Sequence, residues 1–278
     1  MYLRPATLNE AVQTLAGSGG SILSGGTDFF PALGERAVTG TVVDISGLRE
    51  LQGIAVEPDF VRIGGLTTWT QLIAAPLPRC FDALKAAARE IGSVQIQNRG
   101  TVAGNLCNAS PAADSVPPLL ALDAEVELAS STGTRRVPLA EFITGNRKTV
   151  RQPGEILSHV LVPRAIENAA SVFLKLGARR YLVISIAMVA VVLAKDAAGM
   201  VSDARVSAGS CSVVAKRLKA LERRLIGVRA AAGIGSLAMS NHLDALSPID
   251  DVRATAAYRR DAVLSLVRRA LDECAGRL

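Results

Sequence analysis

A polar segment rich in glycine, asparagine, serine and threonine, residues 91–114, most constrains how this chain can fold. It reads IGSVQIQNRGTVAGNLCNASPAAD and lies between apolar stretches. Loops of this length without regular structure are uncommon in compact domains and are usually functional. Its donor groups can bond phosphate oxygens, and Asp114 could accept from hydroxyls of a ribose or ribityl chain. We expect an irregular ligand-binding loop, the alternative being a well-bonded connector.

A second glycine-bearing turn, Ser24-Gly25-Gly26-Thr27-Asp28, follows a short apolar stretch. Its small residues would let backbone N–H groups close on an anionic ligand without interference from a Cβ atom. The turn is neither a dinucleotide-binding G-x-G-x-x-G between strand and helix nor a phosphate-binding loop ending in G-K-S/T. A phosphate cradle and a plain tight turn both remain open here.

Hydrophobic periodicity predicts a mixture of helices and strands along the rest of the chain. A capping box of Thr7 and Glu10 marks the first helix. In the last helix, Val263, Leu266, Val267, Ala270 and Leu271 share one face, while Arg259, Arg260, Arg268 and Arg269 can point to solvent. The first helix is expected over residues 7–16, further helices over 69–75 and 82–91, and strands over 21–23, 41–45, 60–64, 123–129, 135–139, 156–163, 183–193 and 204–209.

Composition excludes several classes of protein. The longest apolar stretch, residues 182–194, is too short for a bilayer span of about 20 residues, and no secretory signal is visible, so we expect a cytoplasmic protein. Four scattered cysteines and two distant histidines, His159 and His242, predict no metal site. The net charge of +6 is carried by the C-terminal third, but few aromatics accompany it, so no nucleic-acid partner is expected.

Together the two polar segments resemble the FAD-binding medium subunit of molybdenum hydroxylases, the xanthine dehydrogenase and carbon monoxide dehydrogenase family. That family carries A-G-G-T-D in the first loop and I-G-x-x-Q-I-R-N-x-G-T-I-G-G-N-x-x-x-x-S-P-x-x-D in the second. The similarity extends through F-x-K-x-x-x-R-R, at residues 173–180, to the last helix. Four positions depart from the pattern: Ser24 stands for Ala, Gln97 for Arg, Ala103 for Gly, and Val183 for an expected acidic residue.

The resemblance implies which residues contact the flavin. Asp114 would bond the sugar-like part, Lys175 and Leu157 match positions at the cofactor, and Ile91 sits where relatives can place an aromatic beside the ring. For Lys175 the alternative is a solvated lysine, and for Leu157 and Ile91 it is core packing. The diphosphate and adenosine side would be lined by Ser24, Gly25, Gly26, Thr27, Asp28, Thr101, Val102, Ala103, Gly104 and Asn105.

The resemblance also implies an α+β fold of the vanillyl-alcohol-oxidase (PCMH) type in two subdomains, about 1–53 and 54–165, followed by a C-terminal antiparallel sheet-and-helix domain over 166–278. The chain would take electrons from [2Fe–2S] clusters of a small subunit, supplied by a molybdenum cofactor on a large subunit, and pass them to NAD⁺, a quinone or another acceptor. A heterotrimer or its dimer would result. No residue of this chain would be catalytic toward the organic substrate. Alternatives are a stand-alone FAD oxidase or dehydrogenase, with Cys107 as its only candidate for covalent flavin attachment, and a flavin-binding scaffold.

Overall fold

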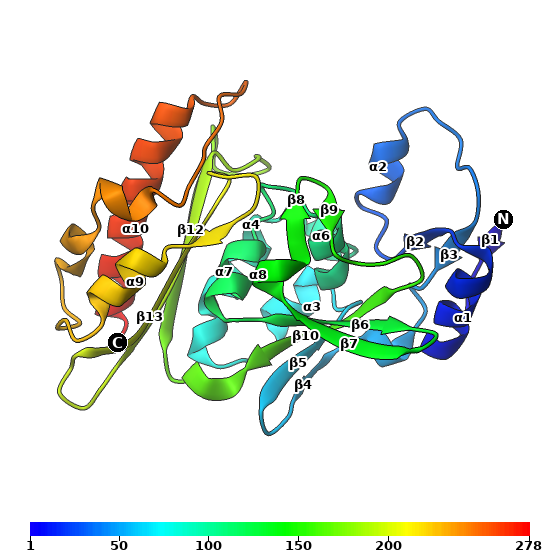
Figure 1. Ribbon diagram of the computed structural model, residues 1–278, viewed down its shortest axis with the longest axis horizontal. Coiled ribbons are helices and arrows are strands. Elements are labelled where there is room, and N and C mark those ends of the chain that lie inside the picture. The colour runs from blue at the N-terminus through cyan, green and yellow to red at the C-terminus, as the bar shows by residue number, and fades with distance from the viewer. The chain divides into compact units, whose positions relative to one another are not determined.

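The computed structural model describes residues 1–278, which form two compact units (Figure 1). Unit 1 comprises Met1–Ala75, Ser93–Ala109 and Ala124–Val162, and unit 2 comprises Pro76–Gly92, Ser110–Asp123 and Pro163–Leu278. Each unit contains sheets and helices, so the α+β class expected from the sequence is confirmed. The subdivisions at residues 53 and 165 remain predictions.

Unit 1 begins with a small parallel sheet in the order β1-β3-β2. Thr7 caps the first helix by accepting from the Glu10 N–H, as the capping signal predicted. The buried face of that helix packs with the apolar Val43 of the third strand in one core cluster. The elements are β1 (Tyr2–Leu3), α1 (Leu8–Ser18), β2 (Ser21–Leu23), α2 (Phe29–Leu33) and β3 (Val42–Asp44).

The larger sheet of unit 1 has the order β4-β5-β10-β6-β7, and the predicted hairpin is confirmed as its β6–β7 edge. The strands are β4 (Ile54–Val56), β5 (Phe60–Gly64), β6 (Glu125–Ser130), β7 (Gly133–Pro138) and β10 (Ile156–Pro163). Around it lie α3 (Trp69–Ala74), α5 (Val94–Gln97), α6 (Val102–Asn108), α8 (Leu139–Phe142) and the short hairpin of β8 (Ile143–Gly145) and β9 (Lys148–Thr149).

Unit 2 is built on an antiparallel sheet in the order β11-β12-β13-β14. Every residue of the central strand from Ala187 to Leu193 is buried, because α9 and α10 cover one face of the sheet and α4 and α7 cover the other (Figure 1). The elements are α4 (Asp82–Glu90), α7 (Val116–Ala121), β11 (Ala170–Leu176), β12 (Ala187–Lys195), β13 (Val201–Gly209), β14 (Lys216–Arg217), α9 (Lys219–Leu225) and α10 (Ala256–Gly276), with single 3-10 turns between several of them.

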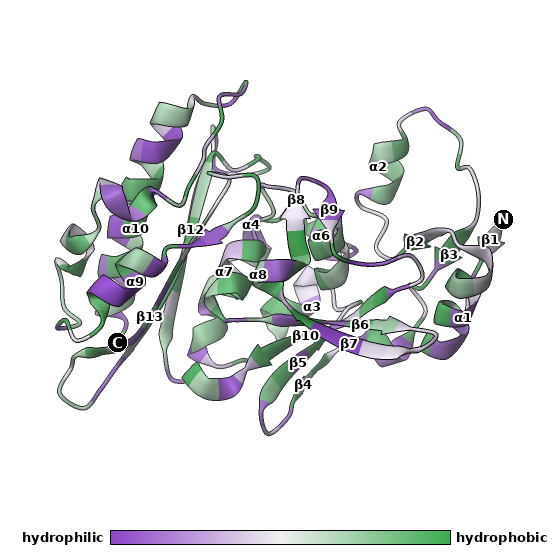
Figure 2. Cartoon of the chain, viewed as in Figure 1, coloured by the Kyte–Doolittle hydropathy of each residue, from purple (hydrophilic) through white to green (hydrophobic).

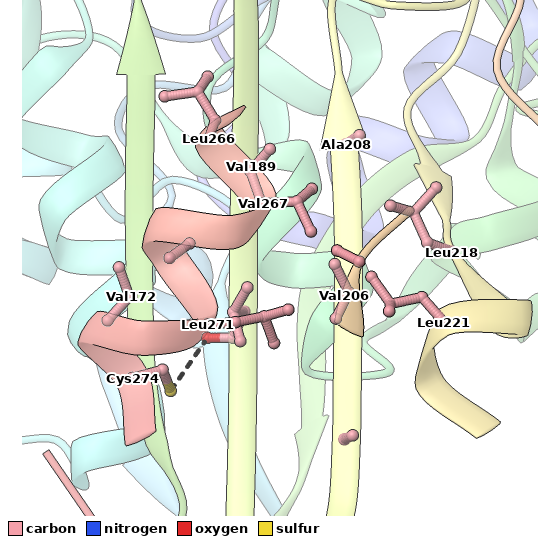
Figure 3. Packing of buried hydrophobic residues seen from close by; sticks show 14 of the residues in the cluster. Val172, Val189, Val206, Ala208, Leu218, Leu221, Leu266, Val267, Leu271 and Cys274 are labelled. Carbon is pink, nitrogen blue, oxygen red and sulfur yellow. Dashed lines mark hydrogen bonds between the residues drawn. The ribbon is translucent and has the colours of Figure 1, made fainter. Parts of the chain in front are cut away.

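The main core of unit 2 lies between its sheet and α10. Leu266, Val267 and Leu271 of α10 pack against Val189 and neighbouring strand residues (Figure 3). The face predicted from periodicity is therefore the buried one. Colouring by hydropathy shows both green and purple segments along α10, as expected for a helix with one buried side (Figure 2).

Two expectations for this unit are wrong. The strand expected over 183–193 begins only at Ala187, because its neighbour β11 ends at Leu176, the residue that pairs with Ala187. Arg259, expected to point to solvent, is 3% exposed. Its guanidinium donates to the carbonyls of Ile186 and Ser210 and pairs with Asp251, so it holds neighbouring loops together.

Candidate functional site

The turn at residues 24–28 connects β2 to α2 and presents unused backbone donors. The N–H groups of Gly25, Gly26, Thr27 and Asp28 donate to no other group of the chain. Gly26 has a φ of 76°, which favours glycine because an L side chain rarely adopts it. A short run of free amide donors is the arrangement that binds an anion such as a diphosphate.

This turn lies directly against the second polar segment. A Cβ atom added at Gly25 would lie 1.9 Å from the carbonyl oxygen of Arg99, so only glycine allows the approach. The Ser24 and Thr101 hydroxyl oxygens are 3.3 Å apart and hydrogen-bonded. At the far end of the turn, the Asn108 side chain donates to the Asp28 carboxylate over 2.9 Å. The two predicted loops are therefore joined at both ends of the turn.

The second segment is not the irregular loop that was expected, because it contains α5 and α6. Ser93 and Thr101 cap these helices, their side-chain oxygens accepting from the Ile96 and Gly104 N–H groups. Side-chain capping of this kind stabilises a helix start by about 1 kcal/mol. The serine and threonine that cap these helices can be seen in the sequence, but the glycine and asparagine content of the segment favoured the prediction of a loop.

The backbone donors at the start of α6 are already used within unit 1. The Val102 and Ala103 N–H groups donate to the carbonyls of Thr67 and Gly65. Ala103 lies in a helix and has no positive φ, and its methyl group faces Gly65. The alanine at this position therefore adds no backbone strain. The free amides of residues 25–28 are therefore the better anion donors, and the N-cap Thr101 and Asn108 of α6 contact the turn on both sides.

A cavity of about 120 Å³ opens beside these two segments in unit 1. Sequence reasoning missed several of its polar side chains, which come from separated parts of the chain and carry no local motif. Only the fold brings them together. The lining residues are Ser24, Gly25, Ser46, Gln52, Leu66, Thr68, Gln71, Asn98, Arg99 and Thr101.

Three other predicted positions lie in distinct surroundings. Leu157 is buried in β10 beside a β-bulge, and its carbonyl would lie 2.5 Å from a Cβ at Gly65. Ile91 is half-buried and directly follows α4 in unit 2. Cys107 is half-buried in α6, and burial raises the pKa of its thiol to about 11, which disfavours a reactive thiolate.

Within unit 2, the predicted Asp114 and Lys175 form a buried ion pair. The Lys175 ammonium donates to Asp114 Oδ2 over 2.6 Å, and the Ser185 hydroxyl donates to Oδ1 over 2.5 Å. Burial raises the pKa of Asp114, while Lys175 and Ser185 act in the opposite direction. Lys175 is thus not the solvated lysine of the alternative interpretation. Val183, which stands where the family has an acid, packs against Gly177 instead.

The remaining titratable groups give no sign of a metal centre. No three His, Cys, Asp or Glu side chains lie together so as to hold an ion. His159 contacts Glu127 and Arg62 through Nδ1, at 3.1 Å from each, in a half-buried polar cluster on the larger sheet of unit 1. None of the helices combines the length and apolar character of a membrane span.

Two family descriptions match the chain. Residues 1–165 match the FAD-binding domain in molybdopterin dehydrogenase, and residues 173–274 match the carbon monoxide dehydrogenase flavoprotein C-terminal domain. Together they cover nearly all of both units.

Individual relatives agree with these matches. The chain is 31% identical to the FAD subunit of nicotinate dehydrogenase from Eubacterium barkeri, over 96% of this chain and 93% of the relative. It is 29% identical to the medium chain of carbon monoxide dehydrogenase from Hydrogenophaga pseudoflava, over 98% and 95%. A chain of carbon monoxide dehydrogenase from Oligotropha carboxidovorans superimposes with a TM-score of 0.92 at 26% identity, covering 100% of this chain and 98% of that one.

Proposed function

The chain belongs to the FAD-binding medium subunits of the molybdenum hydroxylases, and on that premise we propose that it holds FAD and transfers electrons within a multi-subunit dehydrogenase. The observation that carries the proposal is the run of unused amide donors at residues 25–28, held against the second polar segment. An FAD diphosphate is the anion expected there from the family.

The residues present fit the diphosphate of FAD. Free N–H groups supply donors, the one acidic side chain of the turn, Asp28, accepts a hydrogen bond from the Asn108 amide, and the glycine at position 25 permits the backbone to approach the neighbouring segment. Ser24 and Thr101 offer hydroxyls at the edge of the adjoining cavity. Two of the four departures from the family pattern, Ser24 and Ala103, lie in these segments and are compatible with this use, since neither requires strained backbone.

We assign the other residues by the resemblance. Asp114 bonds the sugar-like part of the cofactor, Lys175 and Leu157 lie at the cofactor, and Ile91 lies beside the isoalloxazine ring. The polar cavity side chains Ser46, Gln52 and Gln71 complete the set near the diphosphate. Residues 24–28 and 101–105 line the diphosphate and adenosine side.

Bound flavin supplies redox chemistry that accepts single electrons and delivers a pair. The chain itself binds and orients the cofactor, and its own groups perform no acid–base step on the organic substrate. Electrons come from [2Fe–2S] clusters of a small partner subunit, which receives them from a large subunit with a molybdenum cofactor. They leave to NAD⁺, a quinone or another acceptor. We infer a cytoplasmic heterotrimer, or its dimer.

A stand-alone flavin oxidase or dehydrogenase is the competing function. Cys107 is the candidate for covalent attachment in that case, but its raised pKa leaves it as a thiol at neutral pH. The resemblance to medium subunits over nearly the whole chain favours the electron-transfer role.

The test compares two routes of flavin reduction. The FAD-loaded chain is mixed anaerobically with candidate substrates, first alone and then with the co-expressed partner subunits, and the visible flavin bands are followed. Bleaching only with the partners supports the proposal. Bleaching by substrate and the isolated chain would assign the stand-alone function instead.

A further inference from the structure

Ser185 stands out among the groups around Asp114, because neither the sequence motifs nor the family pattern points to it. Its side chain is 2% exposed and its hydroxyl donates to Asp114 Oδ1 over 2.5 Å. Lys175 occupies the other carboxylate oxygen. Both oxygens therefore have a donor, one from the end of β11 and one from the segment that precedes β12.

The backbone next to Ser185 is fixed by a buried hydrogen bond. The next residue, Ile186, accepts a hydrogen bond from Arg259 Nη1 over 2.6 Å through its carbonyl. Arg259 is anchored in turn by Asp251 at 2.7 Å. A chain of direct contacts thus runs from α10 through Arg259 to the segment that carries the serine, so the hydroxyl cannot drift from the carboxylate without breaking buried hydrogen bonds.

We propose that Ser185 is a positioning residue for the flavin site, whose hydroxyl fixes the Asp114 carboxylate through their hydrogen bond. The inference rests on the proposed function, because Asp114 is assigned to the cofactor there. The family pattern has an acidic residue at position 183, where this chain has the uncharged Val183, so Ser185 is the polar group of this segment that contacts Asp114. Orientation and charge of Asp114 then depend on one hydroxyl and one ammonium.

The groups around Asp114 have opposing effects on the pKa of its carboxyl. Burial is the largest influence on Asp114 and raises its pKa, and the Glu90 carboxylate of α4 acts in the same direction. Lys175 of β11 and the Ser185 hydroxyl oppose them. Glu90 itself lies 4.0 Å from the exposed Arg180. Removing the hydroxyl leaves Lys175 as the only group that favours the ionised form by direct contact.

The test measures FAD affinity as a function of pH in the full chain carrying Ser185→Ala, Ser185→Thr or the control Ser207→Ala. Ser207 is a buried serine of β13 whose hydroxyl donates to the Pro117 carbonyl, so its loss removes a hydrogen bond but leaves Asp114 untouched. The dissociation constant is obtained from the quenching of flavin fluorescence. The titration of the Asp114 carboxyl is followed in parallel by carbon NMR without flavin.

We expect Ser185→Ala to weaken FAD binding by about tenfold near pH 5.5 and much less near pH 8, as for loss of about 1.4 kcal/mol from a charged hydrogen bond. Asp114 then titrates at higher pH than in the parent chain, Ser185→Thr restores both properties, and Ser207→Ala changes neither. A pH-independent loss shared with Ser207→Ala, or an unchanged Asp114 titration, overturns the role of Ser185. Absence of FAD binding by the parent chain and by its complex, with Asp114 titration still shifted by Ser185→Ala, contradicts the proposed function and not the Asp114 contact.

Discussion

Replacing Gly25 by alanine tests whether the turn at residues 24–28 is held as the structure has it. The added Cβ would lie 1.9 Å from the Arg99 carbonyl oxygen, whereas real Cβ atoms essentially never approach closer than 3.0 Å. The turn or the Arg99 backbone must therefore move by about 1 Å. Neither atom belongs to a flexible side chain, so overpacking of about 1–3 kcal/mol is expected.

A displacement of this size takes the amide donors of the turn out of hydrogen-bond range of an anion. Each hydrogen bond to a charged group contributes about 1.5–3 kcal/mol, so the loss of two corresponds to at least about a 100-fold weaker affinity for FAD. Titration calorimetry measures that affinity. Thermal unfolding without FAD separates a folding defect from a binding defect.

The matched control is Gly17→Ala in α1, where an added Cβ meets nothing within 4 Å. It should leave FAD affinity unchanged and stabilise the chain by about 0.5–1 kcal/mol, because alanine favours a helix over glycine. A folded Gly25→Ala chain that binds FAD within about threefold of the parent refutes the close approach and the role of the turn.

Three further predictions follow from the structure. Lys175→Met should lower the free energy of unfolding by about 3 kcal/mol near pH 8, and the loss should shrink in acid as the raised pKa of Asp114 lets its unpaired carboxylate protonate; denaturant titrations at several pH values measure both. Arg259→Ala should lower the free energy of unfolding by about 3 kcal/mol, because the buried carbonyls that it contacts lose their donor. The half-exposed Arg260→Ala should lower it by less than about 0.5 kcal/mol, and equal losses would contradict the structural role of Arg259. Cys107 should react with iodoacetamide only slowly near pH 8 because of its pKa of about 11, and acid denaturation should release all flavin unattached; a flavin-bearing peptide by mass spectrometry would support the oxidase alternative.

Local signals in the sequence predicted the elements whose own side chains decide their structure. The Thr7 cap, the β6–β7 hairpin and the apolar face of α10 were all visible as spacing or period, and the structure confirms them. One arginine of α10, Arg259, does not follow the prediction that the arginines of this helix point to solvent. Arg259 was placed in solvent because charged residues are rarely buried, yet both of its terminal nitrogens have partners, the carbonyls of Ile186 and Ser210 and the carboxylate of Asp251.

The site was predictable only where a motif marks it. The turn at residues 24–28 and Asp114 carry recognisable patterns, so the sequence alone singles them out as candidates. Ser185 was read as part of a strand, and the cavity residues Ser46, Gln52 and Gln71 belong to no pattern, because the fold alone brings them near the motif residues. Helix α6 was missed because glycine and asparagine suggested a loop while a single threonine cap was enough to start a helix.

The most direct test of the flavin assignment is the visible spectrum of the purified full chain and of its co-expressed complex, each before and after addition of FAD. The cofactor is released by denaturation, identified and counted. Flavin absorption bands with about one FAD per chain in the complex are the expected result. A well-folded complex that stays colourless at saturating FAD would contradict the assignment of residues 24–28 and 101–105 to a flavin site.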